Sequence, residues 1–279
     1  MITRWVKNPV HKLIWLYRQV TCHQVLPDFI IIGAQKSGTT SLFYYLTKHP
    51  QLLPSYVKEV HFFDGGLNPN TNNFAKGSTW YYAHFPSKKT LASSHYRTFE
   101  ASPLYIFNPL VPKRIFDLIP DIKLIAVLRN PTERAISHYF HEKRAGRESL
   151  PIMEALLHEE KRLESVIADE EYKSVEFIRY SYKSRGHYKE QIERFLNYFS
   201  RQQILIINFE AFVDEPEKTL REVFEFVGID TEYKVKNLKP RNVGTQKSDV
   251  DPEVYRYLNK YFMPHNQALY NLLGKSFDW

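Results

Sequence analysis

Largely apolar runs alternate along this chain with stretches in which apolar residues recur every three or four positions. The strongest runs cover residues 29–32, 122–128 and 203–209. Short runs of β-branched and aliphatic residues are typical of strands buried on both faces of a sheet. The stretches with helical spacing, which predict helices between and after these strands, cover residues 41–48, 111–118, 132–144, 187–199 and 217–227.

Weaker patterns fill the intervals. Residues 51–54 and 96–100 are short strand candidates. Residues 65–96 are rich in Gly, Asn, Ser and Tyr, which predicts an excursion with short helices, and residues 151–180 are charged and predicted to be helical. Strands separated by helices predict an α/β fold, a central parallel sheet flanked by helices on both faces.

The first strong strand runs directly into a glycine turn. Gly33 ends the strand, hydroxylated residues follow and a helix begins, an arrangement in which backbone N–H groups and the positive helix end bind a phosphate. Gly33 and Gly38 keep the spacing of a Walker A loop, but Thr39 follows Gly38 and the lysine stands earlier, at Lys36. We therefore predict a P-loop kinase-like fold whose cation lies at the front of the loop; the alternative is an ordinary turn with an exposed lysine. The predicted phosphate-binding residues are Lys36, Ser37, Gly38, Thr39, Thr40 and Ser41.

Composition limits the remaining possibilities. The chain has 279 residues, 43% of them hydrophobic and 15% aromatic, which excludes a disordered chain. We predict one domain over residues 28–279, preceded by a basic, helical extension over residues 1–27. The formal charge of +7 suits an anionic partner, and by itself it does not separate a nucleotide from nucleic acid or a membrane surface.

The amino-terminal residues and the single cysteine bear on location. No segment approaches the roughly 20 apolar residues of a membrane span, and Cys22 has no partner for an intrachain disulfide. Residues 1–25 are basic and have no small-residue cleavage site, so we predict a helix that packs on the domain or rests on a membrane surface. The predicted location is the cytoplasm.

A second anion-binding element follows the next strong strand. Arg129 comes at the end of the strand, and Ser137 lies eight residues on, about two helical turns into the next element. An arginine clamp and a serine donor at this separation suit one phosphate. With Gln35-Lys36-Ser37-Gly38-Thr39, this segment resembles the sulfotransferases that use 3′-phosphoadenosine 5′-phosphosulfate (PAPS). The resemblance implies that the loop binds the 5′-phosphosulfate and that Arg129 and Ser137 bind the 3′-phosphate.

The stretch Lys58-Glu59-Val60-His61-Phe62-Phe63-Asp64 is similar to one in the heparan sulfate (glycosaminoglycan) sulfotransferases. Sulfuryl transfer to a hydroxyl needs a base, and a carboxylate near the loop can take the proton. The resemblance implies that Glu59 is the base, with His61 as the rival, and that Lys36 stabilises the leaving phosphate. The residues expected to contact the acceptor are Lys58, His61, Asp64 and Ser102.

The carboxyl-terminal part also resembles the 3-O-sulfotransferase group, from Val250-Asp251-Pro252 to the terminal Gly274-Lys275-Ser276-Phe277-Asp278-Trp279. Two positions depart from the family pattern. A lysine in Glu-Lys-Ser/Thr-Pro is replaced by Ala101, which removes a cation expected near a polyanionic acceptor. In the loop that closes over the nucleotide, Gly244 matches and the expected lysine does not, which leaves Lys247 or Arg241 as candidates to replace it.

The resemblance implies a PAPS-dependent enzyme that releases 3′-phosphoadenosine 5′-phosphate (PAP), without a metal or a nucleic-acid partner. The acceptor is expected to be a hydroxyl of a carbohydrate, a glycolipid or another alcohol; an amine is possible. Arg185-Gly186-x-Tyr188, at the start of a predicted helix, could approach the nucleotide; a helix-start glycine with an aromatic residue packed behind it explains these residues equally well. A P-loop kinase or NTPase and a non-catalytic protein that binds sulfated glycan are the alternatives. Lys36 ahead of Gly38, and Arg129 where a kinase has an acidic metal ligand, speak against the kinase.

Overall fold

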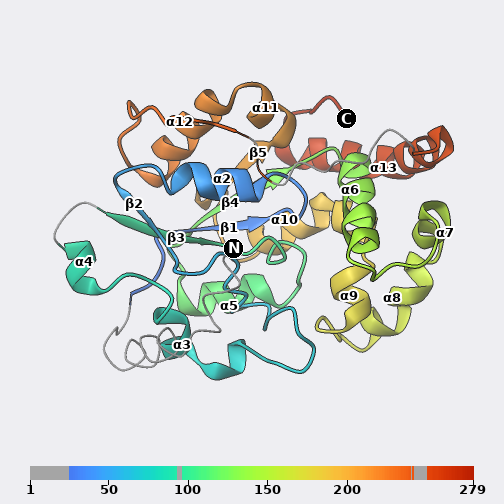
Figure 1. Cartoon of the computed structure of the whole chain (residues 1–279), viewed down its shortest axis with the longest axis horizontal. Coiled ribbons are helices and arrows are strands. Elements are labelled where there is room, and N and C mark those ends of the chain that lie inside the picture. Colours follow the sequence, from blue (N-terminus) through green and yellow to red (C-terminus); the bar gives the residue numbers. More distant parts are fainter. Residues whose placement is uncertain (1–24, 93–95, 240, 242–249) are drawn as a thin grey trace.

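The core of the protein is a five-stranded parallel sheet. The computed structural model describes residues 25–92, 96–239, 241 and 250–279. The strand order is β2-β3-β1-β4-β5, and every neighbouring pair is parallel (Figure 1). The strands are β1 (Phe29–Gly33), β2 (Leu52–Pro54), β3 (Arg97–Ala101), β4 (Lys123–Leu128) and β5 (Ile204–Asn208).

Each face of the sheet has its own apolar core, because successive side chains of a strand point to opposite faces. Ile30 and Ile32 of β1 belong to one cluster, and Phe29 and Ile31 belong to the other. All of these side chains are buried. The short apolar runs of the sequence therefore mark strands covered on both sides, as expected for a parallel sheet.

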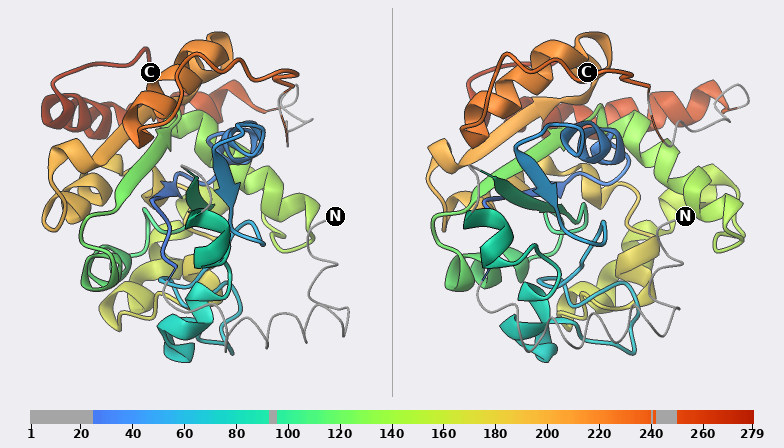
Figure 2. Two further views of the ribbon diagram at one scale, coloured as in Figure 1. Left: turned by 90° about the vertical axis from the view of Figure 1, so that its left-hand side faces the viewer. Right: turned by 60° about the vertical axis from the view of Figure 1, so that its left-hand side comes forward.

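Helices cover both faces. On one side, α2 (Thr39–Leu46), α11 (Phe209–Asp214) and α12 (Pro216–Val227) lie together, as the views of Figure 2 also show. On the other side lie α5 (Val111–Leu118) and α10 (Tyr188–Leu196). The remaining helices are α3 (Ser78–Tyr82), α4 (Lys88–Ala92), α6 (Pro131–Arg144), α7 (Ile152–Leu157), α8 (Glu159–Ala168), α9 (Val175–Arg179) and α13 (Pro252–Leu273), with 3-10 turns η2 (Phe74–Lys76), η3 (Ser184–Gly186) and η4 (Arg201–Gln203).

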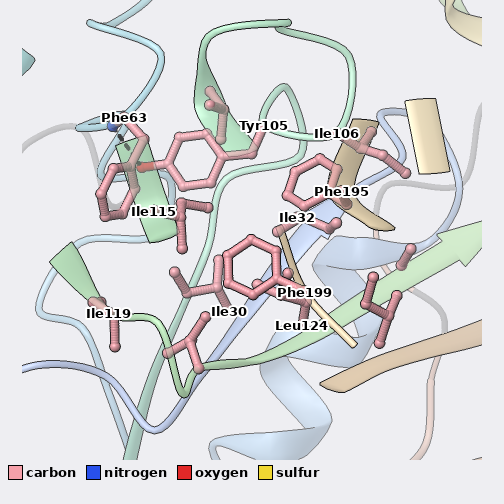
Figure 3. Packing of buried hydrophobic residues seen from close by; sticks show 14 of the residues in the cluster. Ile30, Ile32, Phe63, Tyr105, Ile106, Ile115, Ile119, Leu124, Phe195 and Phe199 are labelled. Carbon is pink, nitrogen blue, oxygen red and sulfur yellow. Dashed lines mark hydrogen bonds between the residues drawn. The ribbon is translucent and has the colours of Figure 1, made fainter. Parts of the chain in front are cut away.

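Part of the apolar core joins the sheet to the loops at its carboxyl edge. Figure 3 shows Ile30, Ile32 and Leu124 of the sheet packed with Phe195 and Phe199 from the α10 region, and with Ile106 and Tyr105 from the turn after β3. The Tyr105 hydroxyl accepts hydrogen bonds from the backbone N–H of Phe62, at 2.8 Å, and of Phe63, at 3.4 Å. The loop after β2 is thus fixed to the loop after β3.

The predicted fold class is confirmed, and most predicted elements agree with the structure to within one or two residues. The helix predicted over 111–118 coincides with α5. For α6, the cap is Asn130: its Oδ1 accepts hydrogen bonds from the N–H groups of Thr132, at 2.9 Å, and Glu133, at 3.3 Å. The division into an extension and one domain stays a prediction, and residues 1–24 lie outside the described part.

Close packing at η3 gives a test of the fold. A Cβ added at Gly186 would lie 2.6 Å from Phe262 of α13 and 2.9 Å from Pro131 of α6. We expect Gly186→Ala to lower the free energy of unfolding by about 1–3 kcal/mol through overpacking, measured by chemical denaturation. The double variant Gly186→Ala/Phe262→Leu should regain part of the loss; an equally stable single variant would contradict this packing.

Candidate active site

The phosphate loop is held tightly between its neighbours. A Cβ at Gly33 would overlap Ile106, and one at Gly38, whose φ is 78°, would lie 2.8 Å from the Phe209 ring. Both positions therefore require glycine. Gly38 also precedes α2, and no side chain among the described residues caps the first turn of that helix. The N–H groups of this turn, which includes Thr39, Thr40 and Ser41, are therefore available to an anion.

Arg129 is attached to this loop. Its Nη1 donates to the carbonyl oxygen of Lys36 at 3.1 Å, and its Nη2 forms an ion pair with Glu133 Oε2 at 3.2 Å. The guanidinium lies 4.9 Å from the centre of the Phe209 ring. Its buried Nε has no partner in the described part of the chain. Arg129 therefore keeps donor capacity at the edge of the phosphate loop.

Positive charge gathers around Lys36. Burial lowers the pKa of Lys36, and the nearby Arg144 and Arg129 lower it further while Glu142 opposes them. On α6, Arg134 and His138 are fully buried, and Arg134 Nη1 and both ring nitrogens of His138 lack hydrogen-bond partners among the described residues. Burial and neighbouring cations hold the pKa of His138 well below its usual range, so His138 is neutral. The positive charge around Lys36 therefore favours the binding of an anion.

Glu59 follows β2 and is anchored at the end of β3, where its N–H donates to the Ala101 carbonyl at 3.0 Å. Its side chain is 39% exposed; Oε1 pairs with Lys58, and Oε2 lies 3.7 Å from His61 Nε2. Burial alone would raise the pKa of Glu59, but His61 and Lys58 outweigh it and the pKa falls to about 2. Glu59 is thus ionised at any ordinary pH.

His61 lies between two carboxylates. Its Nδ1 is 2.6 Å from Asp64 Oδ2, and its Nε2 faces Glu59. Burial alone would lower its pKa, but Asp64 and Glu59 raise it to about 10. A protonated imidazole has no free lone pair for a proton, whereas the ionised Glu59 carboxylate can accept one. Both residues have positive φ angles, 65° and 51°, and such backbone strain clusters at functional sites.

Glu100 and Ser102 support this loop from beneath. The buried Glu100 accepts hydrogen bonds from Tyr81 Oη at 2.7 Å, Tyr105 Oη at 3.2 Å and Ser102 Oγ at 2.8 Å. Ser102 Oγ in turn accepts from the His61 N–H at 3.1 Å. Because Ser102 is fully buried and its hydroxyl is occupied, the expected contact between Ser102 and the acceptor is not supported, and we assign Ser102 to the framework.

A pocket of about 340 Å³ opens beside Asp64, one imidazole ring away from Glu59. Its two cations already serve the framework: Arg114 donates to the Phe63 carbonyl at 2.7 Å, and Lys173 donates to the carbonyl oxygens of residues 65, 66 and 68. The rest of the wall is carboxylate, amide, aromatic or apolar, and includes Pro69, Asn72, Asn108, Leu110, Glu170, Glu171 and Tyr172.

Comparison with known proteins agrees with this geometry. The chain matches the sulfotransferase domain family over residues 26–265. It belongs to that family. The membrane-associated sulfotransferase kil1 of Dictyostelium discoideum is 31% identical over 91% of this chain and 66% of its own length. Heparan sulfate glucosamine 3-O-sulfotransferase 5 of Mus musculus is 29% identical over 92% of this chain and 75% of its own. The chain spans about a third of the bifunctional heparan sulfate N-deacetylase/N-sulfotransferases that it also matches.

Solved structures agree with this assignment. A sulfotransferase from Alicyclobacillus acidocaldarius is 28% identical and superposes with a TM-score of 0.70, covering 91% of this chain and 98% of that one. The mouse sulfotransferase SULT7A1, crystallised with PAP, shares the fold at 15% identity and a TM-score of 0.51, covering 91% and 88%. The resemblance and the enzyme class inferred from the sequence, a sulfotransferase, are therefore confirmed.

The structure brings most predicted site residues of this sulfotransferase domain to one edge. Ser137 is half-buried on α6, two turns beyond Arg129. Ser37 is buried in the loop, and its hydroxyl has no partner among the described residues. Arg241 approaches the loop, since its backbone N–H donates to Ser41 Oγ at 2.9 Å. Gly244 and Lys247 lie outside the described residues.

Some functional contacts were not predicted. Arg185 was expected near the nucleotide, but the contact between its Nη1 and Gln35 was not predicted. Lys173 and the Tyr81–Tyr105 pair gave no recognisable sequence signal. In the described part of the chain, no group of three or more His, Cys, Asp or Glu side chains could hold a metal, and no helix is long and apolar enough to cross a membrane. The cytoplasmic location and the membrane contact of residues 1–25 stay predictions.

Glu100 predicts a pH effect on stability. Burial raises its pKa from 4.5 to about 7, so the folded protein keeps a proton that the unfolded chain loses. Its contribution to stability must fall as the pH rises from about 4.5 to 7. We expect Glu100→Gln to gain stability relative to the wild type between pH 5 and pH 8, measured by urea unfolding. The exposed Glu225→Gln is the control, and parallel pH curves for Glu100→Gln and the wild type would refute the assignment.

Proposed function

We propose that this sulfotransferase domain transfers the sulfuryl group of PAPS to a hydroxyl of a carbohydrate or glycoconjugate. The main support is the order of groups along the carboxyl edge of the sheet. Glu59 lies beyond β2, the phosphate loop follows β1 and Arg129 follows β4, while the framework beyond β3 joins Glu59 to the loop. Base, donor site and nucleotide clamp thus lie along one edge.

The proposed step is an in-line displacement at sulfur. The acceptor oxygen forms a new S–O bond while its proton passes to Glu59. The bridging S–O bond to the 5′-phosphate breaks, and its electron pair stays on the phosphate oxygen of PAP. Lys36 and the first turn of α2 stabilise that oxygen, in the manner of phosphoryl transfer, where positioning and charge stabilisation dominate. Arg129 and Ser137 hold the 3′-phosphate.

The low pKa of Glu59 shapes this mechanism. A carboxylate with a pKa of about 2 is a weak base, so proton transfer becomes favourable only as the acceptor oxygen bonds to sulfur and its own acidity rises. His61, held protonated by Asp64, keeps Glu59 ionised and oriented until that moment. The catalytic advantage then rests on geometry and charge more than on base strength.

The acceptor side favours an uncharged sugar over a sulfated polymer. Ala101 supplies no cation, and its side chain is buried in the core. In the pocket beside Asp64, Lys173 gives its three N–H donors to backbone carbonyls, Arg114 gives one donor to the Phe63 carbonyl, and Glu170 and Glu171 add negative charge. A polyanion would meet the carboxylates of Glu170 and Glu171 there, whereas hydroxyl groups suit the amides and carboxylates of the wall.

Glu59→Gln tests the base. We expect kcat to fall by about 10²–10⁴-fold, while the Kd for PAP stays within twofold, because Glu59 contacts the acceptor and not the nucleotide. Isothermal titration with PAP in EDTA and a mass-spectrometric rate assay with PAPS measure the two quantities. Lys36→Ala should weaken PAP binding. The surface variant Lys218→Ala should change neither kcat nor the Kd for PAP. Magnesium-dependent ATP binding in place of PAP binding would reject the proposal.

Acceptor charge is tested separately. With PAPS as donor, we expect neutral oligosaccharides and glycolipids to give higher kcat/KM than heparan sulfate of matched length. Increasing the sulfate content of one acceptor backbone should lower the rate progressively. A preference for the most sulfated acceptor, read by mass spectrometry of the products, would contradict the reasoning from Ala101 and the pocket.

A further inference from the structure

One continuous segment touches both the donor loop and the acceptor loop. Residues 173–185, here called the bracing segment, contain α9 and the turn that leads into η3. Lys173 stands at one end and Arg185 at the other; in Figure 1, α9 lies beside α8, at the edge of the molecule away from β2. Both side chains leave the segment to contact loops more than 100 residues earlier in the chain.

Lys173 encloses the turn that follows Asp64. Its Nζ donates to three carbonyl oxygens, those of Gly65 at 2.9 Å, Gly66 at 2.6 Å and Asn68 at 2.9 Å. The same turn is fixed from within, since Asp64 Oδ1 accepts from the Gly66 N–H at 2.9 Å. Asp64 is also the partner of His61, so Lys173 holds the backbone on which the His61–Glu59 pair depends.

Arg185 makes the corresponding attachment at the donor end. Its guanidinium is almost fully buried and donates to Ser181 Oγ at 2.8 Å, to the carbonyls of Phe177 and Ile178 at 3.1 and 2.7 Å, and to Gln35 Oε1. The two carbonyls belong to α9. Gln35 directly precedes Lys36, so one side chain joins α9 to the phosphate loop.

The middle of the bracing segment is anchored to the sheet side of the site. Phe177 stacks on Phe107, with ring centres 4.5 Å apart, and Arg185 lies 5.1 Å from the centre of the same Phe107 ring. Phe107 belongs to the turn after β3, beside Ile106, which fills the space left open at Gly33. The segment therefore has a fixed support between its two ends.

We propose that Lys173 and Arg185 are positioning residues, which hold the acceptor turn and the phosphate loop in register through the bracing segment. This inference rests on the proposed function, because it assigns the two ends to the two substrates of one reaction. In-line attack demands a defined distance and angle between acceptor oxygen and sulfur, and a displacement of about 1 Å can reduce a rate about 100-fold. Neither residue needs to touch a reacting atom.

The two ends have different kinetic signatures. We expect Lys173→Met to lower kcat, or raise the acceptor KM, by about tenfold or more, with the Kd for PAP within twofold of the wild type. Arg185→Gln should raise the Kd for PAP by about tenfold, and Arg185→Lys should restore part of it. Matched controls on the neighbouring helices are Lys161→Met, on α8, and Arg179→Gln, on α9. Equal loss of PAP affinity in Lys173→Met and Arg185→Gln, or no loss of any kind, would overturn the proposal.

A second measurement needs neither nucleotide nor turnover. In the nucleotide-free protein, Arg185→Gln should accelerate amide hydrogen exchange in residues 65–68, although Arg185 has no hydrogen bond to that turn. Unchanged exchange there, in a variant whose melting temperature shows that it is folded, means that the two ends are independent and refutes the coupling. If the wild type itself fails to bind PAP, the proposed function is wrong, while exchange still decides whether the segment couples the two loops.

Discussion

The pairing of β3 with β1 is the constraint on which the site depends. It continues past the strands themselves: the N–H of Ser102 donates to the Ile31 carbonyl at 3.1 Å, and the N–H of Ile106 donates to the Ile32 carbonyl at 2.8 Å. Only a glycine at position 33 leaves room for Ile106 at this approach. As a result, the turn after β3 is fixed against the phosphate loop, and the residues that carry His61 are built on that turn.

The two halves of the site differ in whether their charged side chains have partners. On the donor side, Arg134 and Arg129 have buried nitrogens with no partner in the described part of the chain, which is costly unless an anion binds them. On the acceptor side, the charges in the row Lys58, Glu59, His61 and Asp64 are paired with one another. The donor side is therefore organised for a ligand that brings negative charge, and the acceptor side is already close to neutral. This contrast supports the proposal of a nucleotide on the donor side and an uncharged alcohol on the acceptor side.

Local patterns predicted the elements well because each strand and helix is decided by nearby residues. The glycine spacing around Lys36 and the strand end at Arg129 placed both residues at the carboxyl edge of the sheet, where Arg129 contacts the Lys36 carbonyl; their role in binding the donor stays a prediction. The framework was harder. Ser102 was assigned to the acceptor because of its neighbours in sequence, yet its burial depends on Glu100 and on a loop 41 residues earlier. Lys173 contacts backbone carbonyl oxygens. Because every residue has such an oxygen, no pattern of side chains in the sequence could indicate this role.

Under the proposed function, the ion pair between Arg129 and Glu133 has a consequence for nucleotide exchange. A phosphate that takes the place of Glu133 at Nη2 of Arg129 exchanges one anion for another, so this one contact gains only the difference between two electrostatic attractions. Dissolved ions weaken the old partner and the new one alike, and binding at this corner is therefore buffered against ionic strength. When PAP leaves, the Glu133 carboxylate can pair with Arg129 again. The guanidinium therefore does not have to remain unpaired before the next PAPS molecule binds.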